Sequence, residues 1–175
     1  MHRTKVHVLA VWAIMSLGLA ACVAVTPVLT LEALKNAEYA SEFSSKGKAR
    51  LSDGRFEEAI APGSATKLII TFTDWHAFGD LNGDGLSDAA VILVPNPGGS
   101  GTFYTLEAVV NDDGLPKPIA STLLGDRIKI NAVTLQAGKV TVDMVTHGKN
   151  DPMCCPTQPV TQTYRLEGSH WLREN

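Results

Sequence analysis

From residue 48 onward the chain is a succession of short segments with the residue preferences of β-strands, separated by turn-forming residues. In two of the clearest, 127–135 and 139–145, apolar and polar residues alternate, and Gln-Ala-Gly joins them. Alternation with period two places the apolar side chains on one face of a strand. None of the intervening segments is long enough for the crossover helix that parallel strands require. The sequence therefore predicts a mainly β fold, an antiparallel meander that forms a sandwich or partial barrel.

Further strands are expected at 48–51, 55–60, 67–73, 88–94, 103–110, 118–124, 161–166 and 170–173. We expect the first two of these to pair as a hairpin around the Ser-Asp-Gly turn at 52–54. The segment 88–94 is almost continuously apolar, which indicates burial on both faces. Before the strands, Thr30 is a candidate N-cap for one short helix at 31–37. A single β-rich domain, residues 31–175, is therefore the expected organisation.

The first 21 residues have the order of a secretory signal, with a basic start, an apolar stretch and then small residues. They are followed by Cys22, and the ending Leu-Ala-Ala-Cys resembles the lipobox of bacterial lipoproteins. That resemblance implies cleavage before Cys22, diacylation of its thiol, and a linker at 22–30. The alternative is an uncleaved anchor, because residues 6–25 just reach the roughly 20 apolar residues of a spanning helix. Both place the domain in the cell envelope, on the periplasmic or extracellular face of a membrane, and the lipid anchor is preferred.

The charge of the mature chain argues against a nucleic-acid partner. Residues 1–21 contain two basic residues and no acid, which leaves 13 basic and 18 acidic residues, a net charge of −5. The basic residues form no block that would indicate binding to nucleic acid or to anionic lipid. We therefore expect the partners to be the membrane, through the lipid, and an envelope protein or polysaccharide.

Residues 80–88, between two expected strands, have the spacing of a Ca²⁺ loop. Oxygen-bearing side chains stand at positions 1, 3, 5 and 9, a glycine stands at position 6, and position 7 would supply a backbone carbonyl. These ligands are Asp80, Asn82, Asp84, Asp88 and the Leu86 carbonyl. The simpler alternative is an acidic turn without metal. Because four ligands and the glycine are in register, the sequence favours a Ca²⁺ site, with a structural role.

The loop departs from an EF-hand at position 12, where Val91 replaces the bidentate glutamate. It resembles instead the Asp-x-Asp/Asn-x-Asp-Gly-x-x-Asp loops between the strands of integrin-type propeller blades, including the Phe-Gly that precedes them. A propeller needs several blades, and the chain contains one such loop. The resemblance therefore covers the loop and not the fold.

Once Cys22 is assigned to lipid, the remaining cysteines are the neighbours Cys154 and Cys155. Outside the cytoplasm such a pair can close a vicinal disulfide. Adjacent Cα atoms lie about 3.8 Å apart, below the usual ~4.4–6.8 Å of disulfides, so the ring would be strained. With Met153 and His147 the pair also offers soft ligands for Cu(I) or Zn²⁺. A plain structural turn before Pro156 is the third interpretation, and the sequence leaves all three open.

The sequence contains no recognised catalytic motif. The glycine-rich segment 97–102 lacks the Gly-Lys-Ser/Thr ending of a phosphate-binding loop and leads into a strand. The exported histidines, His76, His147 and His170, have no zinc-binding spacing. We therefore expect a role other than catalysis.

Several segments, among them GDLNGDGLSDAAVILV, STLLGDRIKI and MVTHGKNDPMCCPTQ, resemble a group of small exported bacterial proteins and lipoproteins of unknown function. The resemblance covers residues 61–166 and implies secretion and a shared β-rich domain. Two hypotheses follow for the function. The first is a lipid-anchored, Ca²⁺-stabilised binding module, and the second is an envelope redox protein or enzyme centred on Cys154 and Cys155.

Overall fold

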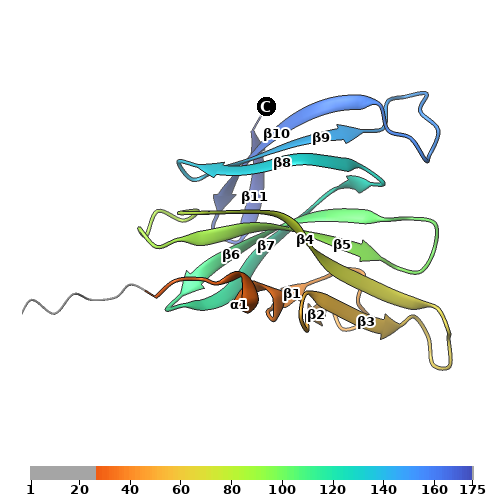
Figure 1. The fold of residues 1–175 in the computed structure, drawn as a ribbon, viewed down its shortest axis with the longest axis horizontal. Helices are drawn as coiled ribbons and strands as arrows, with labels where there is room; N and C mark the ends of the chain where they lie inside the picture. Colours follow the sequence, from red (N-terminus) through yellow and green to blue (C-terminus); the bar gives the residue numbers. More distant parts are fainter. Residues whose placement is uncertain (1–26, 175) are drawn as a thin grey trace, which may run out of the picture.

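The structure is a computed structural model that describes residues 27–174. These residues form two antiparallel sheets, a two-stranded ribbon and one short helix (Figure 1). The elements are α1 (Leu31–Lys35), β1 (Glu38–Ala40), β2 (Lys48–Arg50), β3 (Arg55–Ala59), β4 (Lys67–Gly79), β5 (Asp88–Asn96), β6 (Phe103–Asp112), β7 (Leu115–Asp126), β8 (Lys129–Gln136), β9 (Lys139–Thr146), β10 (Gln158–Glu167) and β11 (His170–Glu174). The predicted mainly β, antiparallel fold with one short N-terminal helix is confirmed, and one sheet is curled into half a barrel.

Both sheets are meanders. The larger sheet has the strand order β3-β4-β5-β6-β7, and the smaller has the order β11-β10-β9-β8. Each strand therefore pairs with its neighbour in sequence, as the closely spaced turns predict. Figure 1 shows β8 to β10 on one side of the larger sheet, and α1, β1 and β2 on the other.

The larger sheet is buried on both faces. One face packs against the smaller sheet around Ile92 of β5 and Met144 of β9, both fully buried. The other face packs under α1, β1 and β2, where Tyr39 contacts a cluster that includes Val91 and Leu93. Successive residues of β5 therefore enter different cores, which confirms the burial on both faces that its apolar run predicts.

The predicted hairpin of residues 48–51 with 55–60 is wrong. β2 pairs with β1 and β3 pairs with β4, and only an isolated bridge joins Ser52 to Arg55. The turn itself is present, but each strand continues into a different sheet. β2 places Ala49 against Tyr39, whereas β3 places Phe56 opposite Ile70. In these pairings both strands contribute apolar side chains to the same core, Ala49 completely buried and Phe56 in part.

The helix and several strand ends differ slightly from the prediction. Thr30 caps α1 as expected, because its Oγ1 accepts a hydrogen bond from the Ala33 N–H at 3.1 Å, but the helix ends at Lys35. β4 continues to Gly79 across a register shift between Phe72 and His76. Polar residues there interrupt the apolar run from which the sequence predicts the strand. Among residues 27–174, no helix has the length and apolar character needed to cross a membrane. The predicted signal, cleavage site and Cys22 lie outside the described residues.

Candidate functional site

The loop that follows β4 is organised by the Asp80 carboxylate. Its Oδ1 accepts a hydrogen bond from the Gly83 N–H at 2.6 Å, and its Oδ2 accepts one from the Gly85 N–H at 3.0 Å. Both glycines have positive φ, 85° and 82°, a conformation that costs glycine little. These backbone donors, Gly83 first, hold the pKa of Asp80 below its ordinary value. Asp80 therefore remains a carboxylate and closes the turn.

The middle of the loop is exposed and held by its own side chains. The Asn82 Nδ2 donates to Asp84 Oδ2 at 2.8 Å, and the Asp84 N–H donates back to Asn82 Oδ1 at 2.9 Å. The other Asp84 oxygen accepts the Leu86 N–H at 2.7 Å. The predicted ligands at positions 3 and 5 therefore already share one hydrogen-bonded turn.

Asp88, at position 9, is completely buried at the start of β5. Its Oδ2 accepts the Leu81 N–H at 2.9 Å, and its Oδ1 accepts the Asn111 N–H at 2.8 Å. None of the ion pairs formed by residues 27–174 involves this carboxylate. Asp88 therefore joins both ends of the loop to the end of β6 and has two backbone donors as its hydrogen-bond partners.

The chemistry of the donors suits a hard cation such as Ca²⁺. Each of the three carboxylates uses two of its roughly four lone-pair sites for the bonds above, so acceptor capacity remains. Asp80 also lines a hollow of about 280 Å³ between the loop and the β8–β9 turn. In the described part of the chain, however, no three His, Cys, Asp or Glu side chains converge as a metal-binding group. The ligand types thus fit the ion, while their side chains are held by hydrogen bonds within the loop and, for Asp88, also by the Asn111 N–H of β6.

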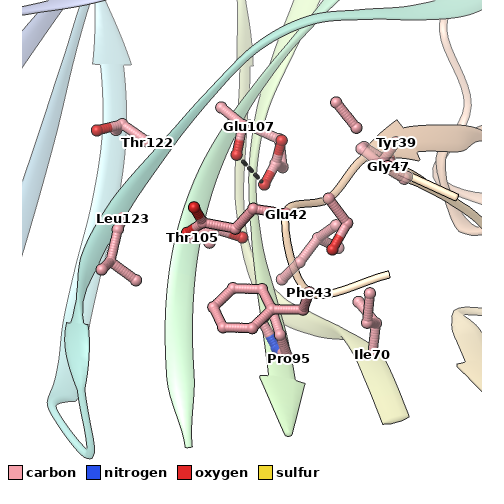
Figure 2. A pocket seen from close by; sticks show the side chains of 14 residues that line it. Tyr39, Glu42, Phe43, Gly47, Ile70, Pro95, Thr105, Glu107, Thr122 and Leu123 are labelled. Atoms are coloured by element: carbon pink, nitrogen blue, oxygen red, sulfur yellow. Dashed lines mark hydrogen bonds between the residues drawn. The ribbon is translucent and has the colours of Figure 1, made fainter. Parts of the chain in front are cut away.

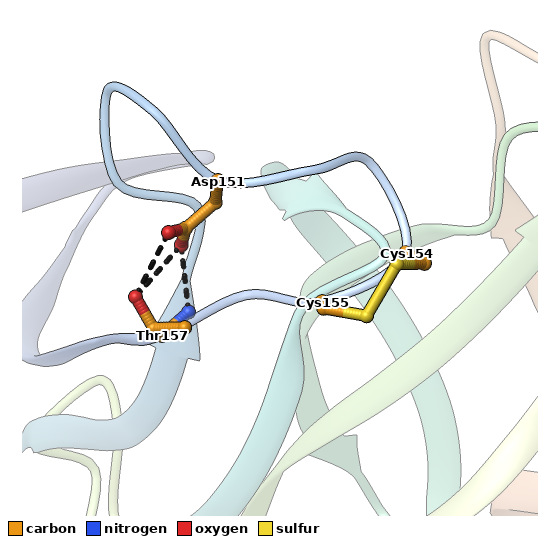
Figure 3. Close-up of a disulfide and its surroundings, with 4 residues drawn as sticks. All are labelled: Asp151, Cys154, Cys155 and Thr157. Carbon is orange, nitrogen blue, oxygen red and sulfur yellow. Dashed lines mark hydrogen bonds between the residues drawn. A yellow bond between two sulfur atoms is a disulfide. The ribbon is translucent and has the colours of Figure 1, made fainter.

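Cys154 and Cys155 lie on the exposed connection between β9 and β10, with their sulfur atoms at disulfide distance (Figure 3). Asp151 shapes this connection. It accepts the Gly148 N–H at 2.8 Å and the Thr157 N–H at 2.7 Å, and these donors lower the pKa of Asp151. The base of the connection is therefore fixed while the cysteine pair remains accessible to solvent.

His147, at the other candidate soft-metal position, has two buried ring nitrogens without a hydrogen-bond partner within residues 27–174. It does not join the cysteines and Met153 in a metal-binding cluster of the described residues. Burial raises the pKa of the neighbouring Asp126 carboxyl, but hydrogen bonds from Arg127 and the Thr102 N–H outweigh it and hold that pKa below its ordinary value.

The structure adds a site that the motifs did not reveal, a hollow of about 610 Å³ between the larger sheet and the segment that follows β1 (Figure 2). Its sheet side carries Leu93, Thr105 and Leu123 in one cross-strand row, and Glu107 and Ser121 in the next. Its other side is formed by residues 39–43 and Gly47.

Glu107 is the unusual member of this hollow, since a carboxyl that is 2% exposed stands among apolar neighbours. Burial raises the pKa of the Glu107 carboxyl from 4.5 to about 7, against the opposing effect of hydrogen bonds from the Thr105 and Ser121 hydroxyls. The Ser121 Oγ donates to Glu107 Oε1 at 2.9 Å. The same burial raises the pKa of Tyr39, and the Glu107 charge adds to it. In the sequence, the signal for this site was a single acidic residue, Glu107, within the largely apolar segment 103–110.

No family model, curated protein or solved structure matches the chain. The case for its function therefore rests on the loop, the cysteine pair and the hollow.

Proposed function

We propose that the chain is an exported, lipid-anchored binding module of the cell envelope, with the Asp80 loop as a structural Ca²⁺ clamp. The observation that carries the binding role is the hollow beside Glu107. Its volume of about 610 Å³ lies within the roughly 300–1,000 Å³ of small-molecule sites. It also combines apolar walls with a few inward-facing polar groups, as such sites do.

The lipid anchor rests on the sequence Leu-Ala-Ala-Cys22 at the end of the apolar N-terminal stretch. Metabolic labelling with palmitate tests it, with the mass of the mature protein measured alongside. Wild type should carry the label and lack residues 1–21, and Cys22→Ala should carry none. The Cys154→Ser, Cys155→Ser double variant is the matched control and should label normally. Label that persists in Cys22→Ala would refute the anchor.

In the Ca²⁺ clamp, the side chains of Asp80, Asn82, Asp84 and Asp88 and the Leu86 carbonyl would hold the ion. Three carboxylates against two positive charges leave one net negative charge, which suits the weak Kd of roughly 10⁻⁴–10⁻³ M typical of extracellular modules. The ion would supply the countercharge that the buried Asp88 carboxylate lacks among the described residues. The clamp would thereby fix the β4–β5 connection against the end of β6.

The module's partner would be an envelope protein or a polysaccharide. Affinity capture from solubilised envelope, with and without Ca²⁺, tests this role. A retained partner that is lost from the Asp84→Asn variant would agree with it, because Asp84 is exposed and belongs to the clamp. Equal capture on an unrelated lipoprotein would contradict it.

The second candidate function is an envelope redox protein, and the observation that favours it is the exposure of both cysteines at disulfide distance. Exposed thiols exchange with partner disulfides more readily than buried ones. The double serine variant should then alter the thiol state of envelope partners, measured by alkylation and mass spectrometry. An unchanged partner thiol state would remove this candidate.

A further inference from the structure

Among the described residues, the only side chains that can carry a charge in the lining of the hollow between the larger sheet and residues 39–47 are acidic. Fourteen described residues line it, and the titratable ones are Tyr39, Glu42 and Glu107. None of the fourteen is a lysine, arginine or histidine. Tyr39 donates its hydroxyl to the Leu34 carbonyl at 2.9 Å, so it offers no free donor to the hollow. The charge that this lining can balance is therefore positive.

The apolar residues that line the hollow are set apart from that carboxyl. Ile70 and Leu93 are 1% and 2% exposed on the sheet side. In the view of Figure 2, Phe43 and Pro95 lie toward one end of the group and Glu107 toward the other. An occupant with an apolar body at one end and a polar group at the other matches this division. The half-buried Phe43 ring is also a surface on which a cation is favourable.

Besides Glu107, a second polar side chain in the hollow, Ser41, has an oxygen without a hydrogen-bond partner among the described residues. The Ser41 Oγ is buried and makes no hydrogen bond within residues 27–174, although Ser41 lines the hollow. Buried hydroxyls without a partner are uncommon, because the lost hydrogen bond to water is not replaced. Its hydroxyl oxygen accepts hydrogen bonds, as does the second oxygen of Glu107. An occupant that donates hydrogen bonds suits both groups, because the ionised Glu107 carboxylate only accepts them and the Ser41 hydroxyl can accept as well as donate.

We propose that this hollow binds a small organic cation, an ammonium group on an apolar body, with the ammonium donating to Glu107 and Ser41. This deepens the proposed binding role and rests on it, because the same hollow carries both, but it depends neither on the anchor nor on Ca²⁺. At neutral pH, before an ammonium binds, a part of the Glu107 carboxyls is protonated. Binding takes the ionised form, so the proton of a neutral Glu107 leaves to solvent.

Three probes of nearly equal size separate charge from shape: 2-phenylethylammonium, 2-phenylethanol and phenylacetate. Calorimetric titration of the purified full chain at pH 8 should show binding of the ammonium at least ten times tighter than of the other two. Its affinity should fall about tenfold between pH 8 and pH 6, as Glu107 becomes protonated. Amide shifts in an NMR titration should concentrate on residues 39–47, β6 and β7.

Two variants test whether the ammonium binds in this hollow, beside Glu107. Glu107→Gln should lose the preference for the ammonium and the pH dependence together. Leu123→Lys places a positive charge on a side chain that is 49% exposed at the hollow, so the fold should survive while ammonium affinity drops at least tenfold. Glu167→Gln, exposed on β10, is the matched control and should bind as wild type does.

Three outcomes would each overturn the proposal: equal affinity for the three probes, ammonium binding unchanged in Leu123→Lys, or no ammonium binding up to 10 mM. Shifts confined to the Asp80 loop would overturn it as well. A chain that labels with palmitate but fails these titrations would refute the cation site and leave the anchored module standing.

Discussion

The Oδ1 of Asp88 accepts the backbone N–H of Asn111 at 2.8 Å, which links two residues that are 23 positions apart. Asn111 in turn donates its Nδ2 to the Pro27 carbonyl at 2.9 Å and accepts the Gly114 N–H at 2.7 Å. One hydrogen-bonded group thus joins the Asp80 loop, the entry to the domain and the β6–β7 turn. This arrangement gives the last predicted Ca²⁺ ligand a role in the fold that is independent of any ion.

Replacing Asp88 by asparagine should destabilise the domain even in the presence of chelator. An asparagine presents an NH₂ group to one of two backbone donors, so one buried N–H loses its acceptor, at a cost of about 1–3 kcal/mol. Urea unfolding followed by circular dichroism measures this. The matched control is Asp112→Asn, whose side chain is 65% exposed and which should change stability by less than about 0.5 kcal/mol. Equal effects of both substitutions would contradict the role of Asp88.

Calcium should raise the melting temperature of the full chain. At 10 mM Ca²⁺, a Kd of roughly 10⁻⁴–10⁻³ M corresponds to about 1–3 kcal/mol of added stability. Scanning calorimetry with Ca²⁺, with Mg²⁺ and with chelator measures the shift. Asp84→Asn should keep the chelator melting temperature, since Asp84 is exposed, and lose most of the Ca²⁺ response. Identical melting with Ca²⁺ and with chelator would exclude the clamp.

The buried Glu107 should make stability fall as the pH rises. Below its ordinary pKa of 4.5 the carboxyl is neutral in both states. Between 4.5 and about 7 the unfolded chain ionises first, so stability is lost through this window and stays lower above it. The loss amounts to roughly 3 kcal/mol at about 1.4 kcal/mol per pKa unit.

Glu107→Gln should remove this dependence, because the amide stays neutral and its oxygen can still accept the Ser121 hydroxyl. Urea unfolding at pH 5, 6, 7 and 8 measures the difference from wild type, which should grow with pH. Glu42→Gln, exposed on the same hollow, is the control and should show a flat difference. Parallel stability curves for wild type and Glu107→Gln would show that Glu107 is not the titrating group.

Serine at both Cys154 and Cys155 should leave thermodynamic stability within about 0.5 kcal/mol of wild type. A bond between neighbours closes no long stretch of chain, so it removes little entropy from the unfolded state. The connection is instead fixed by Asp151. Thermal unfolding measures the effect, and Asp151→Asn provides the contrast: it should lower the melting temperature, because it weakens the hydrogen bonds from the Gly148 and Thr157 N–H groups. A large loss in the double serine variant, with none in Asp151→Asn, would reverse this assignment.

The glycine-rich connection after β5 should tolerate a side chain at Gly99 but not at Gly98. Gly98 has a φ of 82°, and a Cβ there would meet the Thr66 side chain and the Lys67 carbonyl, the latter at 2.9 Å. Gly99 has no neighbour within 4 Å of an added Cβ. Gly98→Ala should therefore cost about 1–3 kcal/mol and Gly99→Ala close to nothing, as measured by chemical denaturation. Equal tolerance at both positions would show that the connection does not pack against Thr66.

The sequence alone determined the fold class and most strands, because period-two alternation and turn residues are local signals. It also determined that 88–94 is buried on both faces, since a run of Ala, Val, Ile and Leu has no polar side to expose. The pairing partners of β2 and of β3 could not be predicted from such local signals. Ala49 lies opposite Tyr39 and Phe56 lies opposite Ile70, and these partners come together only in the assembled core.

For the loop and the hollow, too, the sequence determined one part and the tertiary structure decided the other. The spacing of residues 80–88 singled out the oxygen donors, because all of them belong to one turn. That Asp88 binds Asn111 required β5 and β6 to pair. Glu107 stood in the sequence as one acid in an apolar strand, and alternation alone could not tell whether its face met solvent or core. Tertiary structure settled this by covering that face with residues 39–47, and the resulting burial is what changes the chemistry of the carboxyl.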